Sequence, residues 1–265
     1  MIKKKSLLHV LILLIPILNV GAEIAFPPKG ITTNINSSKI SSQSADFYIQ
    51  RSFKNADNND YEKVLSDLDK AIEIDSNNSN AYYLRGWAKK ILKDSLGALR
   101  DFEKTVAIDP KDSDAYFQIG FMKGILKDYY GSISAYNKAI ELDPSDANSF
   151  FNRGLNKSRI DFIKGAISDY QKAIEIDPKY KNAYYNLGKL AQKSKDYYAA
   201  VSYFNKAISI DNNDYEAYTS RGIAKSKLED KKGACEDYKK AVSLGDKSTE
   251  EWLLNDKGAK WCRDM

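Results

Sequence analysis

The chain has 265 residues, long enough to bury a continuous core. Its formal net charge of +5 includes three lysines among the first five residues; without them 38 of the 41 basic residues remain against 36 acidic ones, a balance that gives no argument for nucleic-acid binding. The single histidine, His9, leaves the chain almost without the commonest general base and metal ligand.

The first 22 residues have the pattern of a secretory signal peptide. Residues 3–5 are lysines, residues 7–20 form an apolar run, and the small residues at 20–22 suit cleavage before Glu23. A retained membrane anchor is the alternative, but the run is short for a span and is interrupted by a histidine, a proline and an asparagine. We therefore expect an exported protein, periplasmic or secreted, with no stable membrane span after cleavage.

Residues 23–44 are rich in Ser, Asn, Ile and Thr and contain the sequence Pro-Pro-Lys-Gly at 27–30. They have no helical period, so we expect a flexible linker. Four apolar residues offer the alternative that this segment docks elsewhere on the chain: Ile24, Phe26, Ile31 and Ile35.

From about residue 45 the sequence repeats at a fixed step of 34 residues, which is typical of an array built from one supersecondary unit. Glycines stand 34 apart at Gly86, Gly120, Gly154, Gly188 and Gly222. Aspartates do the same at Asp75, Asp109, Asp143, Asp177 and Asp211. We number positions within each unit so that the glycine is position 8.

The apolar positions of each unit indicate two short helices, because 4, 8 and 11 share one helical face and 20, 24 and 27 share another. Position 4 is aromatic throughout: Tyr48, Tyr82, Tyr116, Phe150, Tyr184 and Tyr218. Position 24 is Leu68, Phe102, Tyr136, Tyr170, Phe204 and Tyr238. The small residues at positions 8 and 20 let the two helices approach closely, and Asp-Pro at positions 31 and 32 ends the second helix in three units.

This spacing closely resembles the tetratricopeptide repeat (TPR), and the resemblance runs from about residue 45 to 248. It implies an all-α superhelix, an α-solenoid of six helix-turn-helix units plus a C-terminal capping helix. The expected units are 45–78, 79–112, 113–146, 147–180, 181–214 and 215–248. The first unit departs most, with Ser52 for Gly and Ser76 for Pro, while Asn212 and Asp246 replace Pro in the last two.

Residues 249–265 follow the sixth unit and are expected to form the capping helix, with Trp252 at position 4 of a seventh first helix. Cys235 occupies position 21, which is apolar in the other units and should face this segment, where Cys262 lies. In an oxidising compartment an even pair of cysteines favours a disulfide. We predict a Cys235–Cys262 bond; the alternative is a buried thiol at 235 and a loose thiol at 262.

Two positions vary together between the units. Position 7 is Arg51, Arg85, Ile119, Arg153, Leu187 and Arg221. Position 23 is Asp67, Asp101, Ala135, Asp169, Tyr203 and Asp237. Arg accompanies Asp in four units, which predicts an ion pair between the two helices of each, worth about 0.5 kcal/mol if exposed.

By resemblance to the family, positions 2, 5, 9, 12 and 13 line the concave surface of the superhelix. Its aromatic and aliphatic members, which we expect to bind a partner, are Phe53, Tyr83, Trp87, Ile91, Phe117, Phe121, Phe151, Leu155 and Tyr185. Large apolar surfaces of this kind usually mark a binding site. The alternative is that these side chains pack on each other or are covered by residues 24–35. The family's pattern for acidic C-terminal tails, with Lys at position 5 and Asn at 9, is absent.

The sequence contains no Gly-rich phosphate loop and no nucleophile elbow, and it suggests neither a cofactor nor a metal site. We therefore expect a non-enzymatic exported scaffold that binds a protein or peptide segment through apolar anchors, in an assembly or adaptor role. The alternative is a carrier of a small apolar ligand or lipid, which predicts an enclosed cavity.

Overall fold

The computed structural model describes residues 44–255 and 259–264, and these contain helices, turns and no strand. The predicted signal peptide and residues 23–43 lie outside the described residues. No helix within the described ranges has the length and apolar character needed to cross a bilayer.

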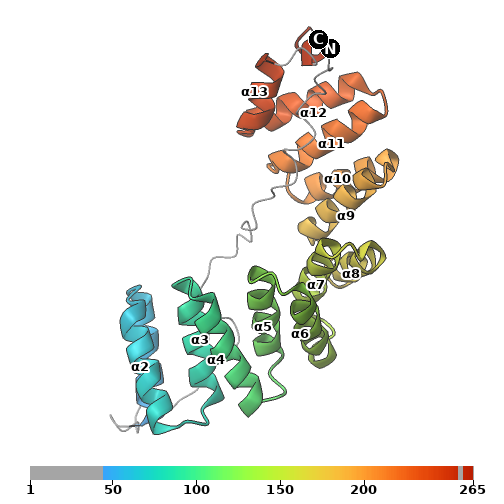
Figure 1. Ribbon diagram of the computed structural model, residues 1–265. Coiled ribbons are helices and arrows are strands. Elements are labelled where there is room, and N and C mark those ends of the chain that lie inside the picture. Colours follow the sequence, from blue (N-terminus) through green and yellow to red (C-terminus); the bar gives the residue numbers. More distant parts are fainter. Residues whose placement is uncertain (1–43, 256–258, 265) are drawn as a thin grey trace, which may run out of the picture.

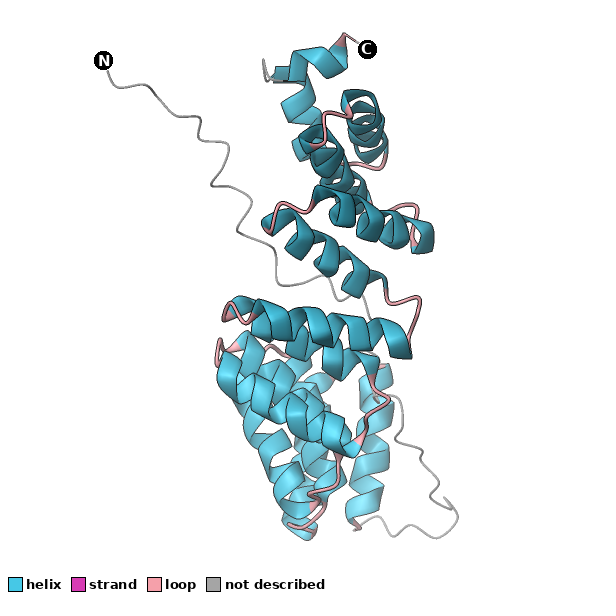
Figure 2. Ribbon diagram, turned by 90° about the vertical axis from the view of Figure 1, so that its right-hand side faces the viewer, coloured by secondary structure: helices cyan, strands magenta, loops and turns pink. Residues whose placement is uncertain are grey.

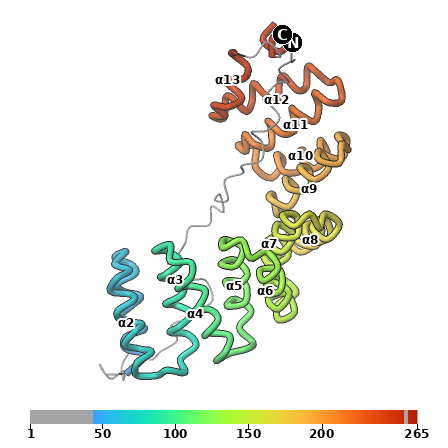
Figure 3. The backbone as a smooth tube through the Cα atoms, in the orientation of Figure 1, coloured from blue at the N-terminus to red at the C-terminus, as the bar shows by residue number. Residues whose placement is uncertain are grey.

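The helices are α1 (Ala45–Asp57), α2 (Tyr61–Ile74), α3 (Ser79–Ile91), α4 (Ser95–Ile108), α5 (Ser113–Ile125), α6 (Tyr129–Leu142), α7 (Ala147–Arg159), α8 (Ile163–Ile176), α9 (Lys181–Lys193), α10 (Tyr197–Ile210), α11 (Tyr215–Lys227), α12 (Lys231–Ser243), α13 (Lys247–Asn255) and α14 (Lys260–Arg263). Each packs on the helix before it and the helix after it. The pairs follow one another along a curved path (Figures 1 and 3), joined by short loops (Figure 2). The predicted all-α solenoid is confirmed.

The two helices of a unit meet where a glycine of the first faces an aromatic ring of the second. A Cβ atom added at Gly86 would lie 2.8 Å from the Phe102 ring, and one added at Gly188 would lie 2.6 Å from the Phe204 ring. Real Cβ atoms do not approach carbon this closely, so a side chain here would separate the helices. The first unit has Ser52 at this place, opposite Leu68, which lacks a ring.

A repeated turn joins the helices of each unit. Its residue at position 15 has a left-handed backbone in all six units: Asn59, Lys93, Lys127, Asp161, Lys195 and Glu229. In five units the next residue is an aspartate that caps the second helix, as where Asp128 accepts a hydrogen bond from the Gly131 amide at 2.9 Å. Such a cap satisfies one of the free amides at the helix start.

Helix α8 is the exception, because Phe162 stands at its N-cap and makes no side-chain hydrogen bond there. The Phe162 ring is 54% exposed and packs over Gly165, the residue whose amide a capping carboxylate would reach.

The C-terminal cap differs from the single helix expected over residues 249–265. Gly245 has a φ of +99°, and α12 ends at Ser243. Asp246 then accepts a hydrogen bond from the Thr249 amide at 3.0 Å, so α13 begins at Lys247 and a separate α14 follows. Because α12 ends before Gly245 and Asp246 caps the next helix, α13 begins at Lys247 rather than at residue 249.

The predicted disulfide is present, and it joins Cys235 of α12 to Cys262 of α14 across 27 residues of chain. The Trp252 ring of α13 packs edge-on against Tyr238 with ring centroids 5.0 Å apart. Together these contacts cover the last apolar face of the array.

Replacing Phe162 by Asp should stabilise α8 by about 1 kcal/mol, because the carboxylate would cap an amide that now has no side-chain partner. Amide hydrogen exchange of α8 under native conditions measures this. Phe162→Ala is the matched control, since it removes the exposed ring without supplying a cap. Equal protection in both variants would contradict the capping argument.

Replacing both cysteines by serine should destabilise the cap by about 3 kcal/mol, the value expected for closing a loop of this length. Hydrogen exchange in α13 should accelerate accordingly, while exchange in α1 and α2 should not change, because distant units of an array are nearly independent. Unchanged exchange in α13 would show that the aromatic packing alone holds the cap.

Candidate binding surface

The odd-numbered helices of neighbouring units touch one another, as α5 touches α7 and α9 touches α11. The surface they share, which we call the inner face, carries half-buried apolar side chains at positions 5, 9 and 13 of the units. These are Phe53, Trp87, Ile91, Phe117, Phe121, Leu155 and Tyr185.

Two of the residues expected on this surface are buried instead. Tyr83 and Phe151 are each only 6% exposed, which leaves little of either ring for a partner. Their rings lie against position 24 of the same unit, Tyr83 with Phe102 at a centroid distance of 5.5 Å and Phe151 with Tyr170 at 5.7 Å. The position-5 aromatics therefore serve the core as well as the surface.

A lysine lies in the middle of the expected apolar groove. The Lys90 ammonium is 3.9 Å from the centroid of the Trp87 ring and 4.6 Å from that of Phe121, so it sits between the two aromatic anchors. It donates a hydrogen bond of 2.9 Å to the side-chain oxygen of Gln118. Burial lowers the pKa of Lys90 to about 8, because the charged form loses hydration there.

Sequence reasoning overlooked Lys90 although a signal was present. Position 12 is small or neutral in the other units: Ala56, Gly124, Ser158, Gln192 and Ser226. A single lysine in that series is an outlier.

The inner face becomes more polar in the last two units. The Gln192 amide donates to the Ser220 carbonyl oxygen at 2.7 Å, linking α9 to α11. Burial lowers the pKa of Lys189 on α9 and raises that of Glu216 on α11, and the charge of each residue opposes the pKa shift of the other. The apolar and aromatic character is therefore concentrated in the earlier units.

Two hollows in the described residues lie elsewhere. One of about 410 Å³ is lined by Phe150, Arg153 and residues of α8, and one of about 320 Å³ is lined by Arg51, Asn55, Lys63, Ser66 and Asp67. Both are open, and neither touches the expected groove residues. The described residues also contain no cluster of three or more His, Cys, Asp or Glu side chains that would hold a metal ion.

Sequence comparison agrees with the helical geometry. A family described as tetratricopeptide repeat matches residues 113–146, 182–214 and 215–244, and a second TPR repeat family matches residues 163–195. The chain contains tetratricopeptide repeats. No curated protein matches this TPR chain at the level of sequence.

Solved structures with the same architecture include TPR and related proteins. A crystal structure of MamA protein is 25% identical, with 67% of this chain and 95% of that chain covered and a TM-score of 0.58. YrrB, a TPR protein with an unusual peptide-binding site, is 20% identical over 69% of this chain and 94% of its own, with a TM-score of 0.58. PilW, a widely conserved type IV pilus biogenesis factor, is 17% identical over 83% and 97%, with a TM-score of 0.64.

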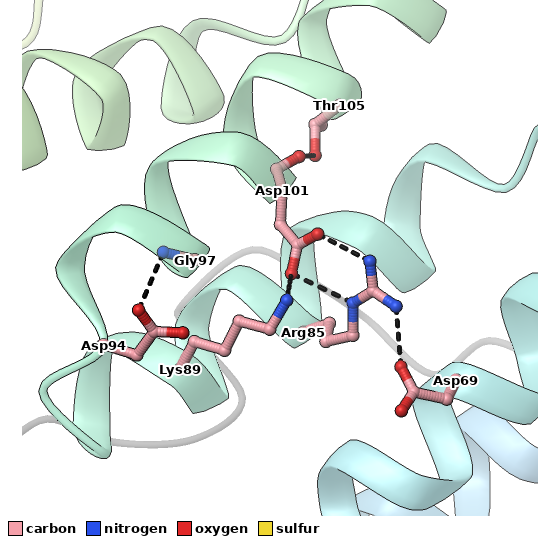
Figure 4. Close-up of polar contacts among 7 residues, drawn as sticks. All are labelled: Asp69, Arg85, Lys89, Asp94, Gly97, Asp101 and Thr105. Carbon is pink, nitrogen blue, oxygen red and sulfur yellow. Dashed lines mark hydrogen bonds and ion pairs between the residues drawn. The ribbon is translucent and has the colours of Figure 1, made fainter.

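The ion pairs predicted between the two helices of four units are confirmed. In the second unit Arg85 donates from Nε and Nη2 to Asp101 at 3.0 and 2.6 Å (Figure 4). Arg153 and Arg221 reach Asp169 and Asp237 in the same way. The first unit has the corresponding pair, Arg51 with Asp67.

Three features of this network were not expected. The carboxylates are buried, with Asp101 only 3% exposed, so the energy of an exposed pair does not apply. In three of the four units a lysine four residues after the arginine adds a second cation, as where Lys89 reaches Asp101 at 2.7 Å. The remaining guanidinium nitrogen of Arg85, Nη1, donates a hydrogen bond of 2.6 Å to Asp69 of the preceding unit, so the network also links neighbouring units (Figure 4).

A double-mutant cycle on Arg153 and Asp169 should show strong coupling between the two side chains. Arg153→Ile and Asp169→Ala together copy the Ile119 and Ala135 combination of the third unit, so we expect the pair to cost less than the sum of the single changes. The coupling should be about 2 kcal/mol, because Arg153→Ile leaves the buried Asp169 with Lys157 alone, at 2.8 Å, and Asp169→Ala leaves both cations without their shared carboxylate.

The local free energy of unfolding of α7 and α8, from hydrogen exchange, measures this coupling. The exposed pair of Lys172 with Glu175 at 2.7 Å in the same unit is the control, and its coupling should stay below about 0.5 kcal/mol. Equal coupling energies for the two pairs would show that burial of the carboxylate does not matter.

Proposed function

We propose that this TPR chain is an exported, non-enzymatic scaffold that binds a segment of another protein on its inner face, in an assembly or adaptor role. The observation that carries the proposal is the row of half-buried aromatic side chains on successive odd-numbered helices, with Trp87 and Phe121 at its centre. Aromatic side chains at the centre of a surface supply most of the binding energy in many protein complexes.

The geometry of the inner face suits an extended or helical segment. Anchors recur on α1, α3, α5, α7 and α9, so one partner segment crossing these helices meets an apolar side chain in each of the first five units. Helical and extended ligands commonly bind through regularly spaced anchors of this kind. Units that contact only their neighbours also permit small changes of curvature on binding.

Two features support export. The first 22 residues have the composition of a signal peptide. The Cys235–Cys262 disulfide suits an oxidising compartment, since thiols stay reduced in most cytosolic proteins. The likeness to YrrB and PilW concerns the fold, so the proposal depends on the residues of this chain.

The described residues favour a scaffold over the two other classes. A carrier of a small apolar ligand needs an enclosed cavity, and no observation on the inner face favours one. An enzyme needs a cluster of groups set for proton transfer or nucleophilic attack. The most deeply buried carboxylates, Asp67, Asp101, Asp169 and Asp237, belong instead to Arg–Asp pairs repeated from unit to unit.

Capture of partners from an envelope extract of the native cell tests the proposal. We expect the Trp87→Ala/Phe121→Ala variant to lose a partner held by the parent chain, with affinity at least about tenfold weaker, because two central anchors are removed. Immobilised chain, mass spectrometry and a circular-dichroism check of helicity complete the measurement.

Tyr130→Ala/Tyr198→Ala is the matched control. These tyrosines lie on even-numbered helices and are 75% and 78% exposed, so the control removes two surface rings away from the inner face. It should capture the same partner as the parent chain. Loss in the control with retention in the inner-face variant would place binding on the even-numbered helices and overturn the proposal.

A further inference from the structure

Adjacent lysines of α3 have opposite environments. Lys89 points to the helix α4 side, where it pairs with Asp101 at 2.7 Å. Lys90 points to the inner face, and among the described residues no carboxylate forms a salt bridge with it. Its polar partner at 2.9 Å is the neutral side chain of Gln118. A half-buried ammonium without a counter-ion is unfavourable, since burial removes its hydration.

The groups around Lys90 are rich in hydrogen-bond donors and poor in acceptors. The ammonium has three N–H bonds, the Gln118 amide two, the Trp87 indole one and the Tyr83 hydroxyl one. The acceptors in this cluster are the Gln118 carbonyl oxygen, which Lys90 already uses, and the Tyr83 oxygen. Trp87 Nε1 is buried and has no hydrogen-bond partner among the described residues.

The four donors converge on one place. Lys90 reaches both the Gln118 side chain and the Trp87 ring, and the Trp87 and Gln118 side chains partly oppose the rise that burial causes in the pKa of Tyr83. Gln118 itself is buried at 6% exposure, so it is held between α3 and α5 and does not swing in solvent. The site therefore presents a cation and several fixed donors, flanked by two aromatic rings.

We propose that Lys90 binds a carboxylate of the partner segment, an aspartate or glutamate side chain with apolar residues on either side. Lys90 supplies the charge and Gln118 a neutral donor, while Trp87 and Phe121 contact the apolar neighbours. This inference rests on the proposed function and adds the chemistry of the ligand. The family's pattern for acidic C-terminal tails has its lysine at position 5, where this unit has Tyr83. The lysine proposed here stands at position 12.

The site also sets an orientation for the ligand. The charges of Asp112 and Asp114 oppose ionisation of the Tyr83 phenol. Burial raises the pKa of both acids. A carboxylate is therefore repelled from the Tyr83 end and drawn to the Lys90 end.

Three pools of synthetic hexapeptides test the inference, with Asp, Asn or Lys fixed at one central position and apolar residues varied around it. The full chain, immobilised at pH 7, should retain the Asp pool at least about tenfold more strongly than the Asn pool, as expected for a charge-assisted hydrogen bond. The Lys pool should be retained least.

Lys90→Met should remove the preference for Asp while keeping apolar side-chain volume at the site. Lys189→Met is the matched control, because it removes another half-buried lysine of the inner face on α9, and its Asp preference should equal that of the parent. Equal Asp preference in parent and Lys90→Met would overturn the inference.

The preference should also depend on pH. Because the free Lys90 has a pKa of about 8, its charge is present below that value and is lost above it. The Asp-over-Asn ratio should therefore fall as pH rises from 7 to 10, and a bound carboxylate should raise the pKa of Lys90, measured by NMR of labelled lysine. Tyr83, Asp112 and Asp114 are the other titratable groups at the cluster, and burial raises the pKa of each.

The remaining outcomes separate the two proposals. Equal retention of Asp and Asn pools, lost together in Trp87→Ala/Phe121→Ala, would support the scaffold and overturn the carboxylate site. No retention of any pool would overturn the carboxylate site, and capture from extract would still decide the scaffold. If Glu23→Gln increases retention of the Asp pool, the side-chain carboxylate of Glu23 competes for Lys90. The assignment of Lys90 to a partner carboxylate is then wrong.

Discussion

One glycine and one ring define the distance between the two helices of most units. Where Gly86 meets Phe102, or Gly188 meets Phe204, the aromatic ring fills the space that a Cβ atom would need. The rings are fully buried, so this contact forms the apolar centre of each unit. Because protein interiors are close-packed, a change of one carbon atom here would move a helix and alter every later unit of the curve.

Charged groups supply a second, more directional link. Each guanidinium of Arg85, Arg153 and Arg221 bonds a buried aspartate of its own unit and a polar side chain of the unit before it: Asp69, Asn137 and Asn205. Such pairs contribute little net stability over an apolar replacement. The third and fifth units have Ile119 and Leu187 in place of the arginine. The bidentate contact to the aspartate orients the guanidinium, so its remaining nitrogen bonds the preceding unit in a fixed direction.

The same repetition that builds the array leaves the inner face free to vary. Positions 9 and 12 do not maintain the Gly–ring contact, and they differ from unit to unit: Trp87 and Lys90 in the second unit, Lys189 and Gln192 in the fifth. A binding surface can thus change its chemistry without a change of fold. This freedom explains how a charged site lies inside a row of aromatic anchors.

The 34-residue period by itself determined the helical pairs, the facing glycines and rings, and the partners of the Arg–Asp bridges, because each of these is a contact at constant sequence separation. The pairing of Cys235 with Cys262 was also within reach, since only two cysteines exist. Tertiary structure decided what depends on contacts between units or on exact helix ends. The surroundings of Lys90 depend on Phe121 and Gln118, which lie on the next odd-numbered helix. Tyr83 and Phe151 pack inward against rings of the second helix of their units. Gly245 shifts the start of α13. Local pattern places a residue on a helix face, but burial and charge balance are set by the neighbours that packing brings to that face.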